Sequence, residues 1–145
     1  ILISSGYDRG GALLDVQGGT PKVVWENKNL RSMLNASVLL GGYVYGIDGN
    51  TGGAQLRCVE AATGKVAWTF KDPDHGALCV ADGKLIVIGE KGELYVGAAN
   101  PQGFQPSARA QVGGGKFWTV PVLANGRLYL RNGAGQVTCL DWGAR

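Results

Sequence analysis

The chain has 145 residues, with 14 Lys and Arg against 11 Asp and Glu, and 25 of its residues are glycine. Average proteins contain only about 7% glycine, so this content argues against a helical bundle. No apolar run reaches the roughly 18 residues of a membrane-spanning helix, and the net charge of +3 is too small for a disordered chain. The basic residues are spread along the chain, which argues against a nucleic-acid partner.

Short apolar runs recur along the chain. One set, in chain order, is ILISSG at the start, GGYVYGID from Gly41, DGKLIVIGE from Asp82 and NGRLYLRNG from Asn125. A second set precedes this one in three units, as NASVLL, HGALCVA and TVPVLA. A third set ends on an acidic position, occupied by Asp15, Glu60, Ala98 and Asp141 at spacings of 45, 38 and 43 residues. Gly, Asn and Asp turns separate the runs, which is typical of short antiparallel strands.

This period predicts an all-β fold. Four short strands in about 42 residues match one blade of a β-propeller, so the chain holds about three and a half blades of four-stranded antiparallel sheet. The expected blade units are residues 1–34, 35–75, 76–117 and 118–145. Closed propellers have about four to eight blades, and the chain opens without Met in an apolar run. We therefore expect it to be the C-terminal part of a longer chain, completed by the remaining blades or by a second copy.

One unit carries a recognisable motif. CVEAATGKVAW combines an apolar strand, Glu60, a TGK turn around Gly64 and, eight residues after the acid, Trp68. This unit resembles the pyrroloquinoline-quinone-like propeller repeat, and Asp15 and Trp25 match it in the first unit. The resemblance implies that both tryptophans pack between blades, and the chain's last unit resembles the C-terminal blade of the non-catalytic bacterial members. Gly64 suits the turn because it tolerates positive φ.

Strand order places one set of loops on a common face. If successive strands alternate in direction, the connections between blades share this face with the hairpins between the second and third strands. Our binding candidates on it are Trp118, Lys116, His75, Asp48, Asn50 and Arg9. Leu34, His75 and Trp118 occupy the same slot in three units and would ring the mouth of the central funnel. Trp118 beside Lys116 could stack a planar ligand or plug the channel, and His75 could contact a ligand, sense pH or be merely solvated.

Other site chemistries find little support. The run from Asp48 starts like a calcium loop but has Val59 where the bidentate Glu belongs, so we predict no metal site. Cys58, Cys79 and Cys139 have no CxxC spacing and are expected to be buried hydrophobes. A single His without a nucleophile partner makes hydrolase chemistry a poor match, so we predict no catalytic residue.

Two function classes remain. The first is a non-enzymatic scaffold or binding module, for which the resemblance implies the periplasm or cell envelope, a protein or small-molecule ligand at the funnel face, and no cofactor. The alternative is a fragment of a quinoprotein dehydrogenase, which would hold pyrroloquinoline quinone and calcium. Those enzymes carry a vicinal Cys pair, and no two Cys are adjacent here. We therefore favour the scaffold.

Overall fold

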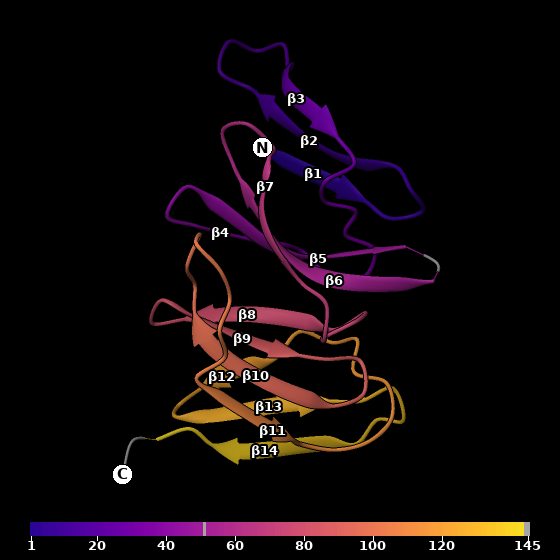
Figure 1. The fold of residues 1–145 in the computed structure, drawn as a ribbon, viewed down its shortest axis with the longest axis vertical. Coiled ribbons are helices and arrows are strands. Elements are labelled where there is room, and N and C mark those ends of the chain that lie inside the picture. The colour runs from indigo at the N-terminus through magenta and orange to yellow at the C-terminus, as the bar shows by residue number, and fades with distance from the viewer. Residues whose placement is uncertain (51, 144–145) are drawn as a thin grey trace.

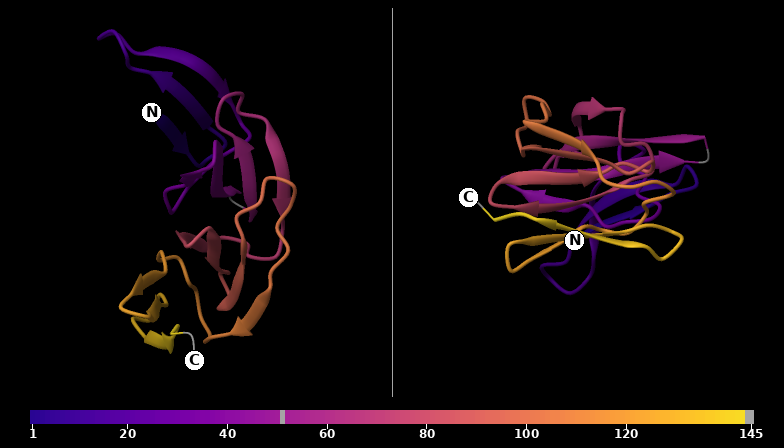
Figure 2. Two further views of the ribbon diagram at one scale, coloured as in Figure 1. Left: turned by 90° about the vertical axis from the view of Figure 1, so that its left-hand side faces the viewer. Right: turned by 90° about the horizontal axis from the view of Figure 1, so that it is seen from below.

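The computed structural model describes residues 1–50 and 52–143, and the side chain of Asn50 lies outside this description. In this part of the chain 14 strands form four antiparallel sheets without a helix (Figure 1). The sheets follow one another along an arc, with the last strands of the two middle sheets on its convex side (Figure 2). This arrangement confirms the predicted all-β partial propeller.

The strands have the following bounds. The first sheet contains β1 (Leu2–Ser5), β2 (Gly10–Asp15) and β3 (Lys22–Asn27), and the second contains β4 (Val38–Leu40), β5 (Tyr43–Asn50), β6 (Gly53–Glu60) and β7 (Val66–Phe70). The third contains β8 (Ala77–Ala81), β9 (Lys84–Ile88), β10 (Glu93–Ala98) and β11 (Ala108–Gln111), and the last contains β12 (Val122–Ala124), β13 (Arg127–Arg131) and β14 (Val137–Asp141). Each strand pairs with its neighbour in sequence, so every sheet is a meander.

The first and last sheets each have one strand fewer than the middle sheets within the described residues. By its position in the repeat, β1 corresponds to β5, β9 and β13. The first sheet therefore has no described counterpart of the inner strands β4, β8 and β12. The last sheet has no counterpart of the outer strands β3, β7 and β11. The arc therefore has an inner gap at one end and an outer gap at the other.

Two-residue turns set the register of the inner hairpins. Asp82 and Gly83 join β8 to β9 with φ of 48° and 66°, and Asn125 and Gly126 join β12 to β13 with φ of 50° and 69°. Positive φ at both central residues gives the turn that follows the natural twist of paired strands. These Asp-Gly and Asn-Gly pairs are the hairpin turns that the sequence signalled.

Apolar side chains fill the spaces between neighbouring sheets. The space between the second and third sheets holds Tyr45, Leu56, Cys58, Leu85 and Tyr95, each at most 1% exposed. The space between the third and last sheets holds a second buried cluster that includes Ile86, Ile88, Phe117, Leu128 and Leu130. Between the first and second sheets the buried cluster contains only Leu30, Val44 and Val59.

The repeat motif joins each sheet to the next. The indole Nε1–H of Trp25 donates to the Ala61 carbonyl at 2.8 Å, and that of Trp68 donates to the Asn100 carbonyl at 2.7 Å. Both indoles are half-buried and reach from an outer strand onto the following blade. Gly64 has φ of 70°, and an added Cβ would lie 2.7 Å from the Trp25 ring.

The acidic positions of the repeat stabilise turns. Asp15 Oδ1 accepts the Gln17 N–H at 2.9 Å, Asp141 Oδ1 accepts the Gly143 N–H at 3.0 Å, and Glu60 accepts from the Thr63 hydroxyl. In the third unit, which has Ala98 at this position, Asn100 accepts the Gln102 N–H at 2.9 Å instead. A carboxylate or amide two residues before a backbone N–H makes a local turn without any tertiary partner.

Candidate functional site

Loops from three places in the chain meet on one face of the arc. Asp74 and His75 lie between β7 and β8, Glu90 lies between β9 and β10, and Lys116 and Trp118 lie between β11 and β12. We call these five residues the loop-face cluster. Backbone hydrogen bonds hold the loops together, since the Glu90 N–H donates to the Pro73 carbonyl at 2.8 Å and the Phe117 N–H donates to the Glu90 carbonyl at 2.9 Å.

The side chains of the loop-face cluster form a connected polar chain. His75 Nδ1 lies 3.0 Å from Asp74 Oδ1 and 3.7 Å from Glu90 Oε2. The Trp118 indole donates its Nε1–H to Glu90 Oε1 at 3.0 Å, and Lys116 Nζ lies 4.8 Å from the centre of the indole ring. The cluster thus combines an imidazole, two carboxylates, an aromatic ring and an ammonium group.

The three residues predicted to share one slot follow each other along this face. Leu34 and His75 line the same small surface hollow, together with Gly49. His75 is linked to Trp118 through Glu90. Trp118 is 40% exposed and Leu34 is 41% exposed, so both are accessible from solvent.

Asp48 differs from the expectation of a surface contact because it is fully buried. Its Oδ1 accepts the backbone N–H and Nε–H of Arg31 at 2.7 and 3.0 Å, and its Oδ2 lies 3.1 Å from Arg57 Nη1. Although burial raises it, the hydrogen bonds from Arg31 hold the pKa of the Asp48 carboxyl below its ordinary value. This carboxylate fastens the connection after the first sheet to the hairpin of β5 and β6.

The two other candidates lie apart from the cluster. Arg9 is exposed in the turn between β1 and β2 and lines a shallow depression on the first sheet with Ile3 and Glu26. Asn50 ends β5, and its side chain lies outside the described part of the chain. The structure therefore groups Trp118, Lys116 and His75 and separates Arg9 from them.

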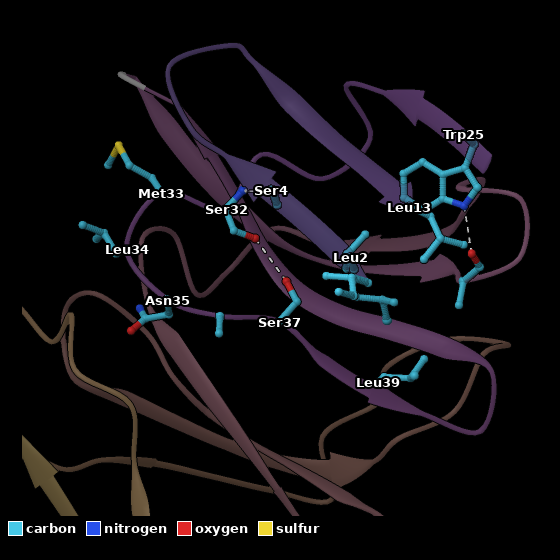
Figure 3. A pocket seen from close by; sticks show the side chains of 14 residues that line it. Leu2, Ser4, Leu13, Trp25, Ser32, Met33, Leu34, Asn35, Ser37 and Leu39 are labelled. Carbon is cyan, nitrogen blue, oxygen red and sulfur yellow. Dashed lines mark hydrogen bonds between the residues drawn. The ribbon is translucent and has the colours of Figure 1, made fainter. Parts of the chain in front are cut away.

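A cavity of about 600 Å³ lies between the first and second sheets (Figure 3). Leu2, Leu13 and Trp25 of the first sheet line one side, and Leu39 and Val44 of the second sheet contribute to the other. The connecting segment from Ser32 to Ser37 runs along it, and the two serine hydroxyls are hydrogen-bonded at 3.1 Å. The volume is in the range of small-molecule sites, yet the cavity lies where the first sheet lacks an inner strand.

Sequence reasoning did not name Glu90 or Asp74 as site residues. It also missed Arg31 and Arg57 as partners of Asp48. The sequence feature that pointed to this cluster was the single His next to Asp74, since an imidazole beside a carboxylate often forms a polar site. The cavity left no signal in the repeat pattern.

The loop-face cluster does not have the ligand set of a calcium site. Calcium takes six to eight oxygen ligands, whereas the loop-face cluster offers two carboxylates and an imidazole. The three cysteines are free and lie in β6, β8 and β14, so none lies next to another in sequence. Burial raises the pKa of the Cys58 thiol to about 11, which leaves it inert.

Comparison with known proteins decides the family. The family model described as outer membrane protein assembly factor BamB matches residues 9–100. The chain belongs to this BamB-like family of PQQ-like β-propeller repeats. No curated protein sequence matches the chain.

Solved structures share the fold of this BamB-like chain. BamB from Moraxella catarrhalis has a TM-score of 0.69 and 21% sequence identity, over 92% of this chain and 38% of that protein. A europium-containing methanol dehydrogenase has a TM-score of 0.56 and 20% identity, over 79% of this chain and 23% of that protein. The computationally designed Ika4 protein has a TM-score of 0.60 and 10% identity, over 99% and 92%. The chain thus spans little more than a third of the BamB structure it matches.

The BamB-like chain offers no helix among its described residues that is long and apolar enough to span a membrane.

Proposed function

We propose that the chain is part of a non-enzymatic β-propeller scaffold of the bacterial envelope that binds other proteins. Support comes from the family model, which describes an outer membrane protein assembly factor, and from the shared fold of BamB. The envelope location rests on these relatives. The role as a binding module rests in addition on features of the chain itself.

The observation that carries the proposal is the exposed apolar surface on the two terminal sheets of the arc. Ile3 and Val23 of the first sheet are 51% and 60% exposed, and Val122 and Val137 of the last sheet are 55% and 64% exposed. The apolar clusters between the interior sheets are buried instead. Exposed apolar sheet faces and unpaired edges favour association, so the ends are suited to further blades or a second copy.

The loop-face cluster supplies a surface for a protein partner. Trp118 is an exposed aromatic ring with a polar N–H already engaged, and Lys116 places a cation beside it. Exposed Trp side chains with neighbouring charges frequently dominate the energy of protein interfaces. His75 has carboxylates beside Nδ1, which does not resemble the arrangement of a base next to a nucleophile.

Cross-linking in bacteria tests the proposal. The chain is directed to the periplasm with an epitope tag, cross-linked and isolated, and the outer-membrane assembly complex is scored in the isolate. We expect co-isolation to fall strongly in Trp118→Ala and to persist in Lys84→Ala, a matched exposed change beside the β8–β9 turn.

A titration with pyrroloquinoline quinone and Ca²⁺ separates the dehydrogenase alternative. Under the scaffold proposal no saturable binding is expected. Saturable quinone binding without co-isolation of the assembly complex would overturn the scaffold in favour of the dehydrogenase fragment.

A further inference from the structure

Three ligand-type side chains of the loop-face cluster converge on one point. One ligand atom each from Asp74, His75 and Glu90 lies within 4.8 Å of the other two. His75 Nδ1 is 3.0 Å from Asp74 Oδ1 and 3.7 Å from Glu90 Oε2. Around zinc, with bonds of about 2.0 Å and tetrahedral angles, ligand atoms are separated by roughly 3.3 Å, which lies between these two distances.

The two carboxylates are already oriented by other groups. The Trp118 indole N–H holds Glu90 Oε1 at 3.0 Å, and this leaves Oε2 directed toward His75. The Ala54 backbone N–H donates to Asp74 Oδ1 at 3.0 Å. Hydrogen bonds of this kind fix the direction of metal ligands and contribute to affinity in metalloproteins.

The backbone beneath the ligands is also fixed. The Glu90 N–H donates a hydrogen bond to the carbonyl of Pro73, one residue before Asp74, so a backbone hydrogen bond connects the two ligand loops. Gly76, next to His75, packs so closely that an added Cβ would lie 1.9 Å from the Ile88 carbonyl oxygen. The ligand-bearing loops are therefore positioned by main-chain packing as well as by side-chain contacts.

We propose that Asp74, His75 and Glu90 bind one divalent transition-metal ion of the zinc class. One imidazole nitrogen and two carboxylate oxygens are a ligand set that zinc, cobalt and manganese accept, whereas calcium requires more oxygen atoms. The Asp74 side chain is 41% exposed, so solvent reaches the cluster and water would complete the coordination of a bound ion.

A bound ion would join two connections directly and a third through the hydrogen bond of Trp118 to Glu90. Asp74 and His75 belong to the crossover between the second and third sheets, Glu90 belongs to the third sheet, and Trp118 lies on the crossover to the last sheet. A bound ion would therefore stabilise the loop face across three successive blades.

Cobalt is the probe for the test, because its visible absorption reports ligand number and geometry. The 145-residue chain, without a histidine tag and with Cys139→Ser to remove the exposed thiol, is titrated with Co²⁺ and then with Zn²⁺ as competitor. We expect saturation at one Co²⁺ per chain, displacement by Zn²⁺, and a rise in Tm on adding Zn²⁺.

Variants separate the site from adventitious binding. His75→Ala should abolish the absorption and the Tm rise, Glu90→Gln should weaken binding, and Trp118→Phe should weaken it by about 10-fold to 100-fold because it removes the N–H that orients Glu90. Asp82→Asn is the matched control, since that carboxylate is 94% exposed in the β8–β9 turn and should leave binding unchanged. Co²⁺ binding that is absent, or equally strong in His75→Ala, would overturn the proposal.

Discussion

The junction between the second and third sheets and the junction between the first and second sheets are built from the same repeat but are filled differently. The former holds a large buried cluster around Tyr45, Leu56 and Tyr95. The latter has three buried apolar residues and a cavity of about 600 Å³. The second and third sheets both have an inner strand, whereas the first sheet has none among the described residues. The shared repeat motif alone therefore does not determine how many apolar side chains a junction between two sheets buries.

The two motif tryptophans show this difference directly. The ring centroid of Trp68 lies 5.9 Å from that of Tyr45 and 6.0 Å from that of Phe104. Its indole N–H also donates a hydrogen bond to the Asn100 carbonyl. Trp25 makes the corresponding hydrogen bond to Ala61, but its ring lines the cavity. An identical residue in an identical position therefore contributes different packing energy in the two junctions.

The largest effect is expected from removing these rings. Trp68→Ala should lower the free energy of unfolding by about 3 to 4 kcal/mol, because it removes packed aromatic contacts. Trp25→Ala should cost only about 1 to 2 kcal/mol, because part of its ring already faces open space. Urea denaturation followed by circular dichroism measures both. Equal losses would show that the cavity does not weaken packing at Trp25.

Asp48→Asn probes the buried carboxylate that holds the connection between the first and second sheets through Arg31. At pH 7 this change should cost about 3 kcal/mol, because Arg31 and Arg57 lose their buried partner. The folded pKa of Asp48 lies below its ordinary value of 3.8, so its stabilisation is complete above that value and is lost as pH falls through the folded pKa.

Thermal melts at pH 7 and pH 3 measure this dependence. The difference in Tm between the wild-type chain and Asp48→Asn should be smaller at pH 3 than at pH 7. The exposed Asp82→Asn control should change stability by less than about 0.5 kcal/mol at pH 7. A difference in Tm that is the same at both pH values would contradict the assigned role of the Asp48 carboxylate.

A smaller effect is expected where the turn of one blade meets the tryptophan of another. Gly64→Ala should cost about 2 kcal/mol, because its positive φ strains any side chain and the new Cβ would meet the Trp25 ring. Gly83→Ala is the matched control, with a φ of 66° and no atom within 4 Å of an added Cβ. It should cost about 1 kcal/mol from backbone strain alone. Equal costs in chemical denaturation would mean that the contact with Trp25 contributes nothing.

The smallest effect concerns the cavity itself. Ala36 lines the cavity, and Ala36→Leu should raise the free energy of unfolding by about 0.5 to 1 kcal/mol by covering apolar surface. Ala62→Leu, an exposed change in the turn after β6, should have no measurable effect in the same denaturation series. Destabilisation by Ala36→Leu would show that the space is not available for apolar atoms.

The repeat made the fold predictable, because strands, turns and motif tryptophans recur at a readable period. Asp82-Gly83 and Asn125-Gly126 specify their turns through local conformation alone, and Asp15, Glu60 and Asp141 do the same for the turns that follow them. Such turns can be predicted from the sequence because they do not depend on tertiary contacts.

The site was predictable only in part. His75, Lys116 and Trp118 could be placed on one face from strand order, and the structure brings them together. The burial of Asp48 could not be read, because it depends on Arg31, which lies 17 residues away on a connection without periodicity. The alignment of Asp74 and Glu90 around His75 likewise depends on how two separate loops are bonded to each other.

The most direct test of the account is the solution mass of the chain, because an arc with two incomplete sheets should associate through its exposed faces. Light scattering after size exclusion should give a mass above the 15.1 kDa of one chain, rising with concentration. A double change, Val122→Lys with Val137→Lys, should lower that mass by charging the exposed face of the last sheet. A single 15.1 kDa species at all concentrations, with a sharp cooperative melt, would contradict the claim that the exposed apolar faces of the terminal sheets drive association.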